Sequence, residues 1–213
     1  MLTSEVICPY CNFEFSAAVW VDGSCEKCGG NYSWSMEFND TMTDGWHVIN
    51  WSEKKSLYIA TTLSNWSRAA NFIHFFKSFD IPIAFDWTEF GKEIFETKSP
   101  RDVDPVSLRE KALNEYNGVS SASYVLVIIP TGGGTNFELG VAYQRFTTTG
   151  SPIISILDET DPVAPISFHY LPGVKRTNSI RAVVDDILTH FGVDSTIVDR
   201  TDFGMHCCFM PPS

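Results

Sequence analysis

The chain has few basic residues, no long apolar run and no even spread of cysteines. It carries 15 Lys and Arg residues against 26 Asp and Glu residues, which gives a formal net charge of −11. Such a surface repels phosphate backbones, so we expect no nonspecific binding of nucleic acid. A small phosphorylated ligand is compatible with this charge, because a local cluster of N–H donors can bind it.

No apolar stretch reaches the roughly 20 residues that a membrane-spanning helix needs. The first six residues, Met-Leu-Thr-Ser-Glu-Val, lack the basic and apolar regions of a signal peptide. We therefore expect a soluble, cytoplasmic protein with no membrane partner. The length of 213 residues, 44% of them hydrophobic, suits one well-packed domain with or without a small appendage.

Four of the six cysteines form two CxxC pairs that are separated by thirteen residues: Cys8, Cys11, Cys25 and Cys28. Four thiolates in two knuckles satisfy a tetrahedral Zn²⁺ ion and leave no open position, so we expect a structural zinc site. Four reduced cysteines packed among aromatic side chains would be the simplest alternative. A redox role is favoured less, because neither pair opens a helix after a core strand. We assign no role to Cys207 and Cys208.

Composition divides the chain into three parts. Residues 1–40 hold the CxxC pairs and many aromatic residues, and alternation over 31–38 predicts a strand in a small zinc ribbon. Residues 41–55 are expected to be a connector. Residues 56–213 form the main domain.

The main domain alternates strands and helices, which indicates an α/β fold with a doubly wound parallel sheet of the flavodoxin or Rossmann kind. The strands are nearly all apolar, as expected when both faces of a sheet are covered. The expected strands are 56–61, 81–85, 123–129 and 151–157, the expected helices are 65–79, 105–117, 136–147 and 180–191, and 86–105 is expected to be a loop or lid.

Ligands of such sheets bind beyond the carboxyl ends of the strands. Two segments should meet there: the turn over 60–65 and the glycine-rich turn over 130–138. The second delivers Glu138 into the first turn of a helix, where the helix N-terminus would keep it ionised. Thr135 and Glu138 also fit an ordinary capping box. The glycines could equally form a flexible turn or a phosphate cradle.

Three other residues belong to the same edge of the predicted sheet. Alternation places Tyr58 on the opposite strand face from its two neighbours, and its hydroxyl approaches Glu138 if the first and third strands are adjacent. A core tyrosine is an equal alternative. Asp86 and Trp87 end the second strand and offer an acid beside a stacking ring, although a simple strand-end turn explains them too.

Two segments carry a resemblance to a known family: Tyr58-Ile-Ala-Thr-Thr-Leu-Ser-Asn65 and, more specifically, Gly134-Thr-Asn-Phe-Glu-Leu-Gly-Val-Ala142. With them, about residues 56–191 resemble the nucleoside 2-deoxyribosyltransferases, a family that includes 2'-deoxynucleoside 5'-phosphate N-hydrolases. The resemblance implies that Glu138 is a nucleophile and that Tyr58 orients it. It also implies an acid at Glu115 and a homodimer or higher homo-oligomer.

The chain departs from the family at three positions. Ser123 stands where many members have Asp, Glu115 stands where Asp is commoner, and Gly132 stands where hydrolase members often have a serine that holds the 5'-phosphate.

The residues expected to line the substrate site are Ala60, Thr61, Thr62, Asn65, Trp87, Gly132, Gly134, Thr135 and Phe137.

The expected function is cleavage or transfer of the N-glycosidic bond of a 2'-deoxynucleoside or its 5'-monophosphate. Glu138 would attack C1' to form a covalent glycosyl ester, and Asp86 or Glu115 would assist the departing base. Two alternatives remain open from the sequence: a non-catalytic nucleotide sensor, and a hydrolase of another N-glycoside such as NAD.

Overall fold

The computed structural model describes residues 3–7, 14–18, 23–24, 31–37, 46–52, 55–97, 104–160, 166–194 and 196. The chain divides into two compact units, Met1–Lys54 and Lys55–Ser213. Among the described residues, no helix has both the length and the apolar character that crossing a bilayer requires.

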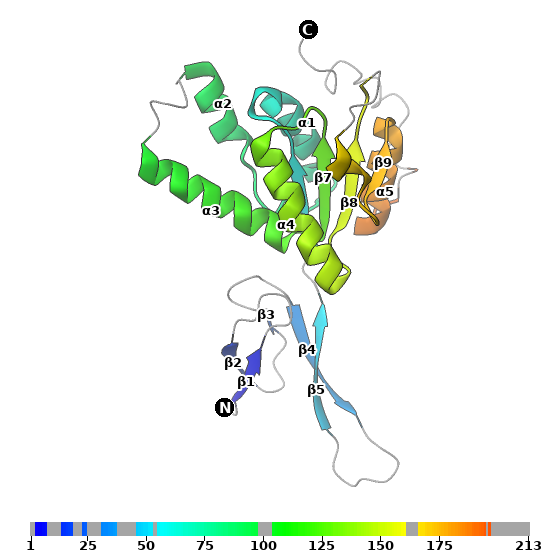
Figure 1. Cartoon of the computed structure of the whole chain (residues 1–213). Coiled ribbons are helices and arrows are strands. Elements are labelled where there is room, and N and C mark those ends of the chain that lie inside the picture. The colour runs from blue at the N-terminus through cyan, green and yellow to red at the C-terminus, as the bar shows by residue number, and fades with distance from the viewer. Residues whose placement is uncertain are drawn as a thin grey trace. The chain divides into compact units, whose positions relative to one another are not determined.

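The N-terminal unit consists of antiparallel strands (Figure 1). β1 (Thr3–Ile7) pairs with β2 (Glu14–Ala18), and β4 (Asn31–Glu37) lies between β3 (Gly23–Ser24) and β5 (Trp46–Ser52). Val6 and Phe15 are opposite each other in the first pair and both are buried. The rings of Phe15 and Tyr32 lie 5.8 Å apart between centroids, so this contact joins the two small sheets.

The prediction of a strand over 31–38 is confirmed by β4, but the expected connector over 41–55 contains a strand, β5. In the sequence, Asp44 and Gly45, residue types that favour turns, precede this strand. Aromatic and β-branched residues follow them from Trp46 to Trp51, and these residue types favour strands. Pairing with β4 supplies the backbone hydrogen bonds.

The C-terminal unit is built on a four-stranded parallel sheet with helices, an α/β fold. The strands are β6 (Leu57–Ala60), β7 (Tyr124–Ile128), β8 (Ile153–Leu157) and β9 (Lys175–Thr177), and they are adjacent in that order. All residues of β6 and β7 are buried, which explains their continuous apolar sequence. The short strand β9 was not predicted from the sequence.

The strand expected over 81–85 is reduced to a single parallel bridge between Ile83 and Leu57. The Leu57 amide donates to the Pro82 carbonyl at 2.8 Å, and the Ala84 amide donates to the Leu57 carbonyl at 2.9 Å. Pro82 has no N–H group with which to extend the pairing. The segment nevertheless takes the edge position beside β6 that its proline predicted.

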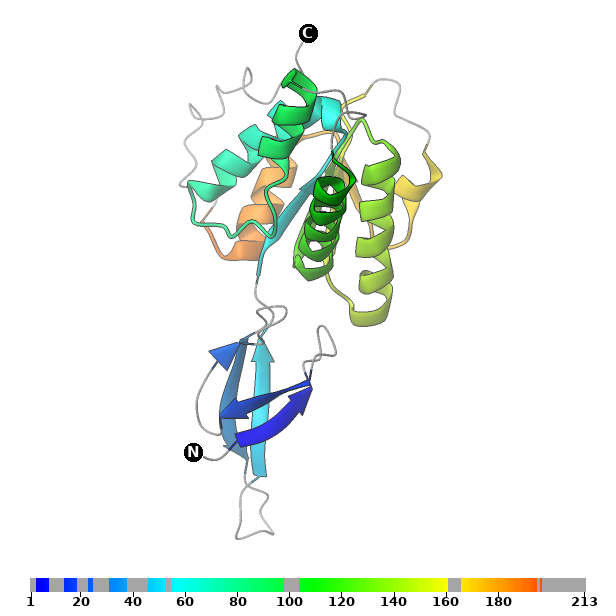
Figure 2. The same ribbon diagram turned by 90° about the vertical axis from the view of Figure 1, so that its left-hand side faces the viewer.

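Helices cover both faces of this sheet. In Figure 2, α3 and α4 lie on one side of it, and α1 and α5 lie on the other. Contacts agree with the picture, since α4 packs on β6, β7 and β8, whereas α5 packs on β8 and β9. The helices are α1 (Trp66–Lys77), which follows the 3-10 turn η1 (Leu63–Asn65), α2 (Thr88–Thr97), α3 (Pro105–Ser121), α4 (Gly133–Thr149) and α5 (Ile180–Phe191), with a further 3-10 turn η3 (Ser167–Tyr170).

Three helices differ from the sequence-based expectation. The expected loop over 86–105 contains α2, whose buried residues Gly91 and Ile94 follow the buried Trp87, just before the helix, at helical spacing. α4 begins at Gly133, earlier than the expected residue 136. α3 does not end at Gly118 but continues to Ser121.

Gly118 stays inside α3 because the helix approaches β6 closely at this point. A Cβ atom added there would lie 2.6 Å from the Cβ of Phe85 and 3.0 Å from Cε2 of Tyr58. A glycine in a helix costs about 1 kcal/mol relative to alanine. Close packing against the ring of Tyr58 gives a physical reason for accepting that cost.

We predict that Gly118→Ala destabilises the fold by about 1–3 kcal/mol, because the overpacked methyl group forces Tyr58 or Phe85 to move. Gly140→Ala is the matched control within α4, where an added Cβ meets nothing within 4 Å. That variant should gain about 0.5–1 kcal/mol from helix propensity. Chemical denaturation of both variants checks this, and equal effects would show that α3 does not pack on Tyr58 as described.

Candidate active site

The centre of the candidate site is a hydrogen bond between a strand and a helix. The hydroxyl of Tyr58, in the middle of β6, donates to Oε1 of Glu138 on α4 at 2.5 Å. Tyr58 is fully buried and Glu138 is partly buried. The sequence-based expectation that Tyr58 faces Glu138 is therefore confirmed, and it holds because β6 and β7 are adjacent.

The start of α4 differs from the capping box that the sequence suggested. Gly132 is the N-cap residue and makes no side-chain cap, and Gly133 and Gly134 form the first helical positions. The first turn contains no acidic residue. Glu138 lies one turn further in, so its carboxylate is directed at Tyr58 and not at the cap. The glycine run is thus the first turn of a helix.

The environment of Glu138 favours its protonated form. Burial raises its pKa to about 8, the hydrogen bond from Tyr58 acts against this rise, and the charge of Glu115 adds to it. The expectation that the helix N-terminus keeps Glu138 ionised is wrong for the free protein, because burial outweighs any dipole effect in the second turn. Burial, followed by Glu138, also raises the pKa of Tyr58, so its hydroxyl remains a donor.

Glu115 of α3 is the third member of this group. Burial raises its pKa, and nearby Lys111 acts in the opposite direction. The charge of Glu115 raises the pKa of both Tyr58 and Glu138, so the three side chains share one electrostatic environment. Gly118 follows Glu115 by three residues, and its lack of a side chain lets α3 approach Tyr58.

Asp86 and Trp87 are held by other partners. Asp86 accepts from Nζ of Lys77 at 2.8 Å and from the hydroxyl of Thr88 at 2.6 Å. Burial would raise the pKa of Asp86, but these two partners outweigh it and lower the pKa. Trp87 is buried, and its Nε1 donates to the carbonyl of Ile59 at 2.8 Å. Within the described residues, no hydrogen bond or ion pair joins either residue to Glu138.

The turns that follow β6 and β7 meet at the carboxyl edge of the sheet, as predicted. The hydroxyl of Thr61 donates to the Pro130 carbonyl at 3.4 Å, and Nδ2 of Asn65 donates to the same hydroxyl at 3.1 Å. A Cβ added at Gly132 would lie 3.5 Å from Cγ2 of Thr62. Polar groups of both turns therefore line one edge.

The remaining expected substrate residues differ in exposure. Ala60 and Thr135 are buried, while Gly134 is open and has nothing within 4 Å of an added Cβ. Phe137 exposes 62% of its surface. Of the two aromatic residues expected near the ligand, Phe137 is therefore the one with a free ring face.

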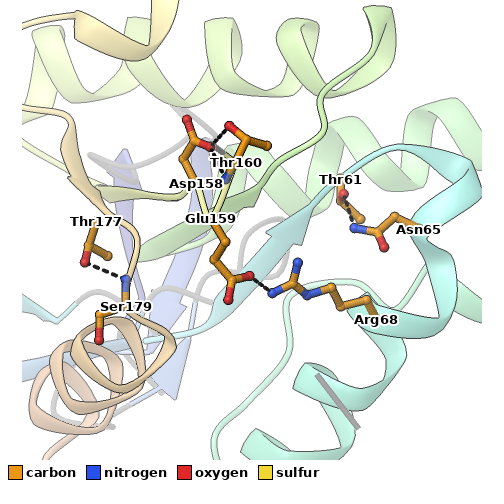
Figure 3. A network of polar contacts seen from close by, with 8 residues as sticks. All are labelled: Thr61, Asn65, Arg68, Asp158, Glu159, Thr160, Thr177 and Ser179. Carbon is orange, nitrogen blue, oxygen red and sulfur yellow. Dashed lines mark hydrogen bonds and ion pairs between the residues drawn. The ribbon is translucent and has the colours of Figure 1, made fainter. Parts of the chain in front are cut away.

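Sequence reasoning missed several residues at this edge. Thr131 Oγ1 and Asn136 Oδ1 are buried without a hydrogen-bond partner in the described part of the chain. Asp158 and Glu159 follow β8 directly, and Glu159 forms an ion pair with Arg68 of α1 (Figure 3). The position of Asp158 and Glu159 behind a predicted strand could have indicated them, but nothing marked Arg68.

The predicted zinc ligands Cys8, Cys11, Cys25 and Cys28 lie outside the described residues. Among the residues that are described, no group of three or more His, Cys, Asp or Glu side chains is arranged to hold a metal ion. Comparisons with protein-family models, with curated proteins and with solved structures find no match to this chain.

We predict that Tyr58→Phe raises the pKa of Glu138 further above its value of about 8, because the hydrogen bond that favours the carboxylate is lost. Tyr124→Phe is the matched control, since Tyr124 is also a buried strand tyrosine that donates to an acid, Asp186, at 2.6 Å. A carboxyl-carbon NMR titration of Glu138 checks this. An unchanged value in Tyr58→Phe would contradict the described hydrogen bond.

Proposed function

We propose that the C-terminal unit is an enzyme resembling the nucleoside 2-deoxyribosyltransferases, with a doubly wound, flavodoxin-like sheet. In this proposal it cleaves or transfers the N-glycosidic bond of a 2'-deoxynucleoside or its 5'-monophosphate. The observation that carries the proposal is the hydrogen bond from Tyr58 to Glu138. It pairs the two residues to which the family resemblance assigns catalytic roles, from segments that are 80 residues apart in sequence.

In the proposed reaction, an oxygen of ionised Glu138 bonds to C1' as the bond from C1' to the base nitrogen breaks. The bonding electrons leave with the base, which takes a proton from Glu115. The transition state has oxocarbenium character, and the product of the first step is a glycosyl ester. A second base or a water molecule then bonds to C1' as the ester bond to Glu138 breaks, and it gives its proton to the carboxylate of Glu115, which restores both acids. Tyr58 fixes the rotamer of the carboxylate throughout.

The electrostatics of the group support this division of roles. Two nearby carboxyl groups disfavour simultaneous ionisation, so one proton is retained between Glu138 and Glu115. Positive charge that develops at C1' stabilises the carboxylate nearest to it, which leaves the proton on Glu115 for the departing base. The pKa of about 8 for Glu138 describes the free protein, before that charge develops.

The exposed side chains suggest how a substrate would lie. Thr62 and Gly132 are partly exposed and Gly134 is exposed, so they offer a polar edge beside the start of α4. Phe137 offers a ring on which a base can stack. Trp87 is buried and engaged with Ile59, so we assign it to positioning the carboxyl end of β6. Asp86 is assigned to the ion pair with Lys77.

A non-catalytic nucleotide sensor is the second candidate. It is favoured by the raised pKa of Glu138, because a protonated acid is a poor nucleophile. The departure from the family at position 123 also favours the sensor, because this chain has Ser123 where many family members have Asp. The Ser123 hydroxyl lies 3.0 Å from Nε2 of His190, and the Ser56 amide donates to it at 3.1 Å. An assay for release of free base distinguishes the two candidates, because the enzyme releases base and the sensor does not.

We further propose that the N-terminal unit is a zinc ribbon and that the chain forms a homodimer or higher homo-oligomer. The order of the strands supports the ribbon. Ile7 pairs with Glu14 and Ser24 pairs with Asn31, so each CxxC pair falls in the connection between two antiparallel strands. Two such connections are the usual source of ligands for a four-thiolate zinc site. The oligomer rests on the family resemblance.

We predict that Glu138→Gln abolishes release of free base from 2'-deoxynucleosides and their monophosphates, with a loss of at least about 1,000-fold, because the nucleophile is removed and its shape is kept. Glu110→Gln on the exposed side of α3 carries the same change in charge and should keep the rate. Chromatography of the released base checks both variants. Base release by Glu138→Gln at the wild-type rate would refute the proposal, and nucleotide binding without any base release would favour the sensor.

For the ribbon, we predict about one zinc ion per chain by metal analysis of the purified protein. Cys25→Ser should lose that zinc and destabilise the N-terminal unit. Cys207→Ser should keep it, since that cysteine lies outside both pairs. Zinc that is absent from the wild type, or retained equally by both variants, would contradict the assignment.

A further inference from the structure

Arg68 is a buried cation at the carboxyl edge of the sheet. It occupies the third position of α1, and its side chain is only 4% exposed. Its Nη2 forms an ion pair with Oε2 of Glu159, whose side chain is 36% exposed. A guanidinium group taken out of water is costly unless its donors are satisfied.

The hydrogen bonding of Arg68 is incomplete. Its Nε is buried and has no hydrogen-bond partner within the described residues. The planar guanidinium carries donors that suit two acceptor oxygens at once, and the described contact with Glu159 uses one of its nitrogens. Figure 3 shows the guanidinium end of Arg68 directed at the carboxylate of Glu159, so the unused Nε donor belongs to the same group that makes this contact.

The surroundings of Arg68 suit an anion. Asn65 is the N-cap residue of α1 and makes no side-chain cap, and the first turn contains no acidic residue. The 3-10 turn η1 runs directly into α1, and the Trp66 amide donates to the Leu63 carbonyl, so the guanidinium of Arg68 is the group that would hold an anion here. A helical side chain leans toward the N-terminus of its helix. Asn65 contacts Thr61, and Thr61 contacts Pro130. This place is therefore continuous with the edge proposed to bind the substrate.

Asp158, the acid next to Glu159, is held more firmly than Glu159. Asp158 is buried, is ion-paired with Arg176 and accepts from the hydroxyl and amide of Thr160. Glu159 is the more exposed of the two, and Arg68 is its described partner. Of these two carboxylates, Glu159 can rotate into solvent with the smaller loss of contacts.

We propose that the guanidinium of Arg68 binds a phosphate monoester group, and that the carboxylate of Glu159 occupies this position in the free protein. A phosphate dianion brings more charge and more acceptor oxygens than a carboxylate, so it displaces Glu159. The group belongs to a nucleotide substrate or to free phosphate. The nucleotide source rests on the proposed function.

The test uses the full chain and three probes: inorganic phosphate, 2'-deoxyadenosine, and 2'-deoxyadenosine 5'-monophosphate. Affinities come from calorimetric titration and from the thermal shift that each probe causes. Glu159→Gln should bind inorganic phosphate about three- to tenfold more tightly than wild type, because the internal competitor is gone. Arg68→Lys should bind it about tenfold more weakly, because the two-pronged donor is lost.

Glu110→Gln is the control for overall charge, since it also removes one negative charge from an exposed helix position. Equal phosphate affinities in Glu159→Gln and Glu110→Gln would overturn the proposal. The Glu159→Gln result also serves if Arg68→Lys fails to fold. Phosphate should raise the melting temperature of Glu159→Gln more than that of wild type, whereas a purely structural ion pair predicts no such rescue.

The two nucleotide probes distinguish the sources of phosphate. Tighter binding of the monophosphate than of the nucleoside, abolished in Arg68→Lys, assigns the site to the nucleotide. Equal binding of both, together with phosphate binding through Arg68, assigns it to free phosphate. Phosphate binding as predicted without any base release would refute the proposed enzyme and leave this site standing. Base release by the wild type, together with an unchanged phosphate affinity in Glu159→Gln, would refute the phosphate site and leave the proposed enzyme standing.

Discussion

The structure of the site depends on one constraint: a carboxylic acid, Glu138, is held against a buried tyrosine of the central sheet. Burial alone would leave the acid unsatisfied, and the Tyr58 hydroxyl supplies the hydrogen bond that offsets this. The ring of Tyr58 in turn needs the close approach of α3, which Gly118 permits. The two helices on one face of the sheet and the strand beneath them thus serve a single contact.

This arrangement has a thermodynamic cost at neutral pH. The pKa of Glu138 is about 8 in the folded chain, whereas an unperturbed glutamic acid has a pKa of about 4.3. Between these values the folded chain keeps a proton that the unfolded chain has lost, so the contribution of Glu138 to stability falls as pH rises through this interval. Such a cost is expected where a side chain is placed for chemistry more than for stability.

Much of the main unit was predictable from the sequence, and the failures have physical causes. Apolar runs correctly predicted three strands of the sheet. The alternation of side chains along the first strand correctly predicted that Tyr58 faces Glu138. The expected strand at 81–85 is a single bridge in the structure, because Pro82 has no N–H group with which to continue the strand pairing. The glycines were misleading as turn signals at two positions: Gly118 lies inside α3, where close packing explains it, and Gly133 is the first residue of α4. The raised pKa of Glu138 and the Arg68–Glu159 pair could not be predicted, because both depend on burial created by segments distant in sequence.

The central claim is that Glu138 forms a covalent bond to C1', and the configuration at that carbon tests it most directly. If the reaction is run in water containing methanol, two displacements return the methyl deoxyriboside to the β configuration of the substrate. We predict that NMR of the methanolysis product shows the β anomer. An α product would mean that methanol attacks directly with Glu138 as a base. That result, or the absence of base release from any deoxynucleoside or monophosphate, would contradict the account.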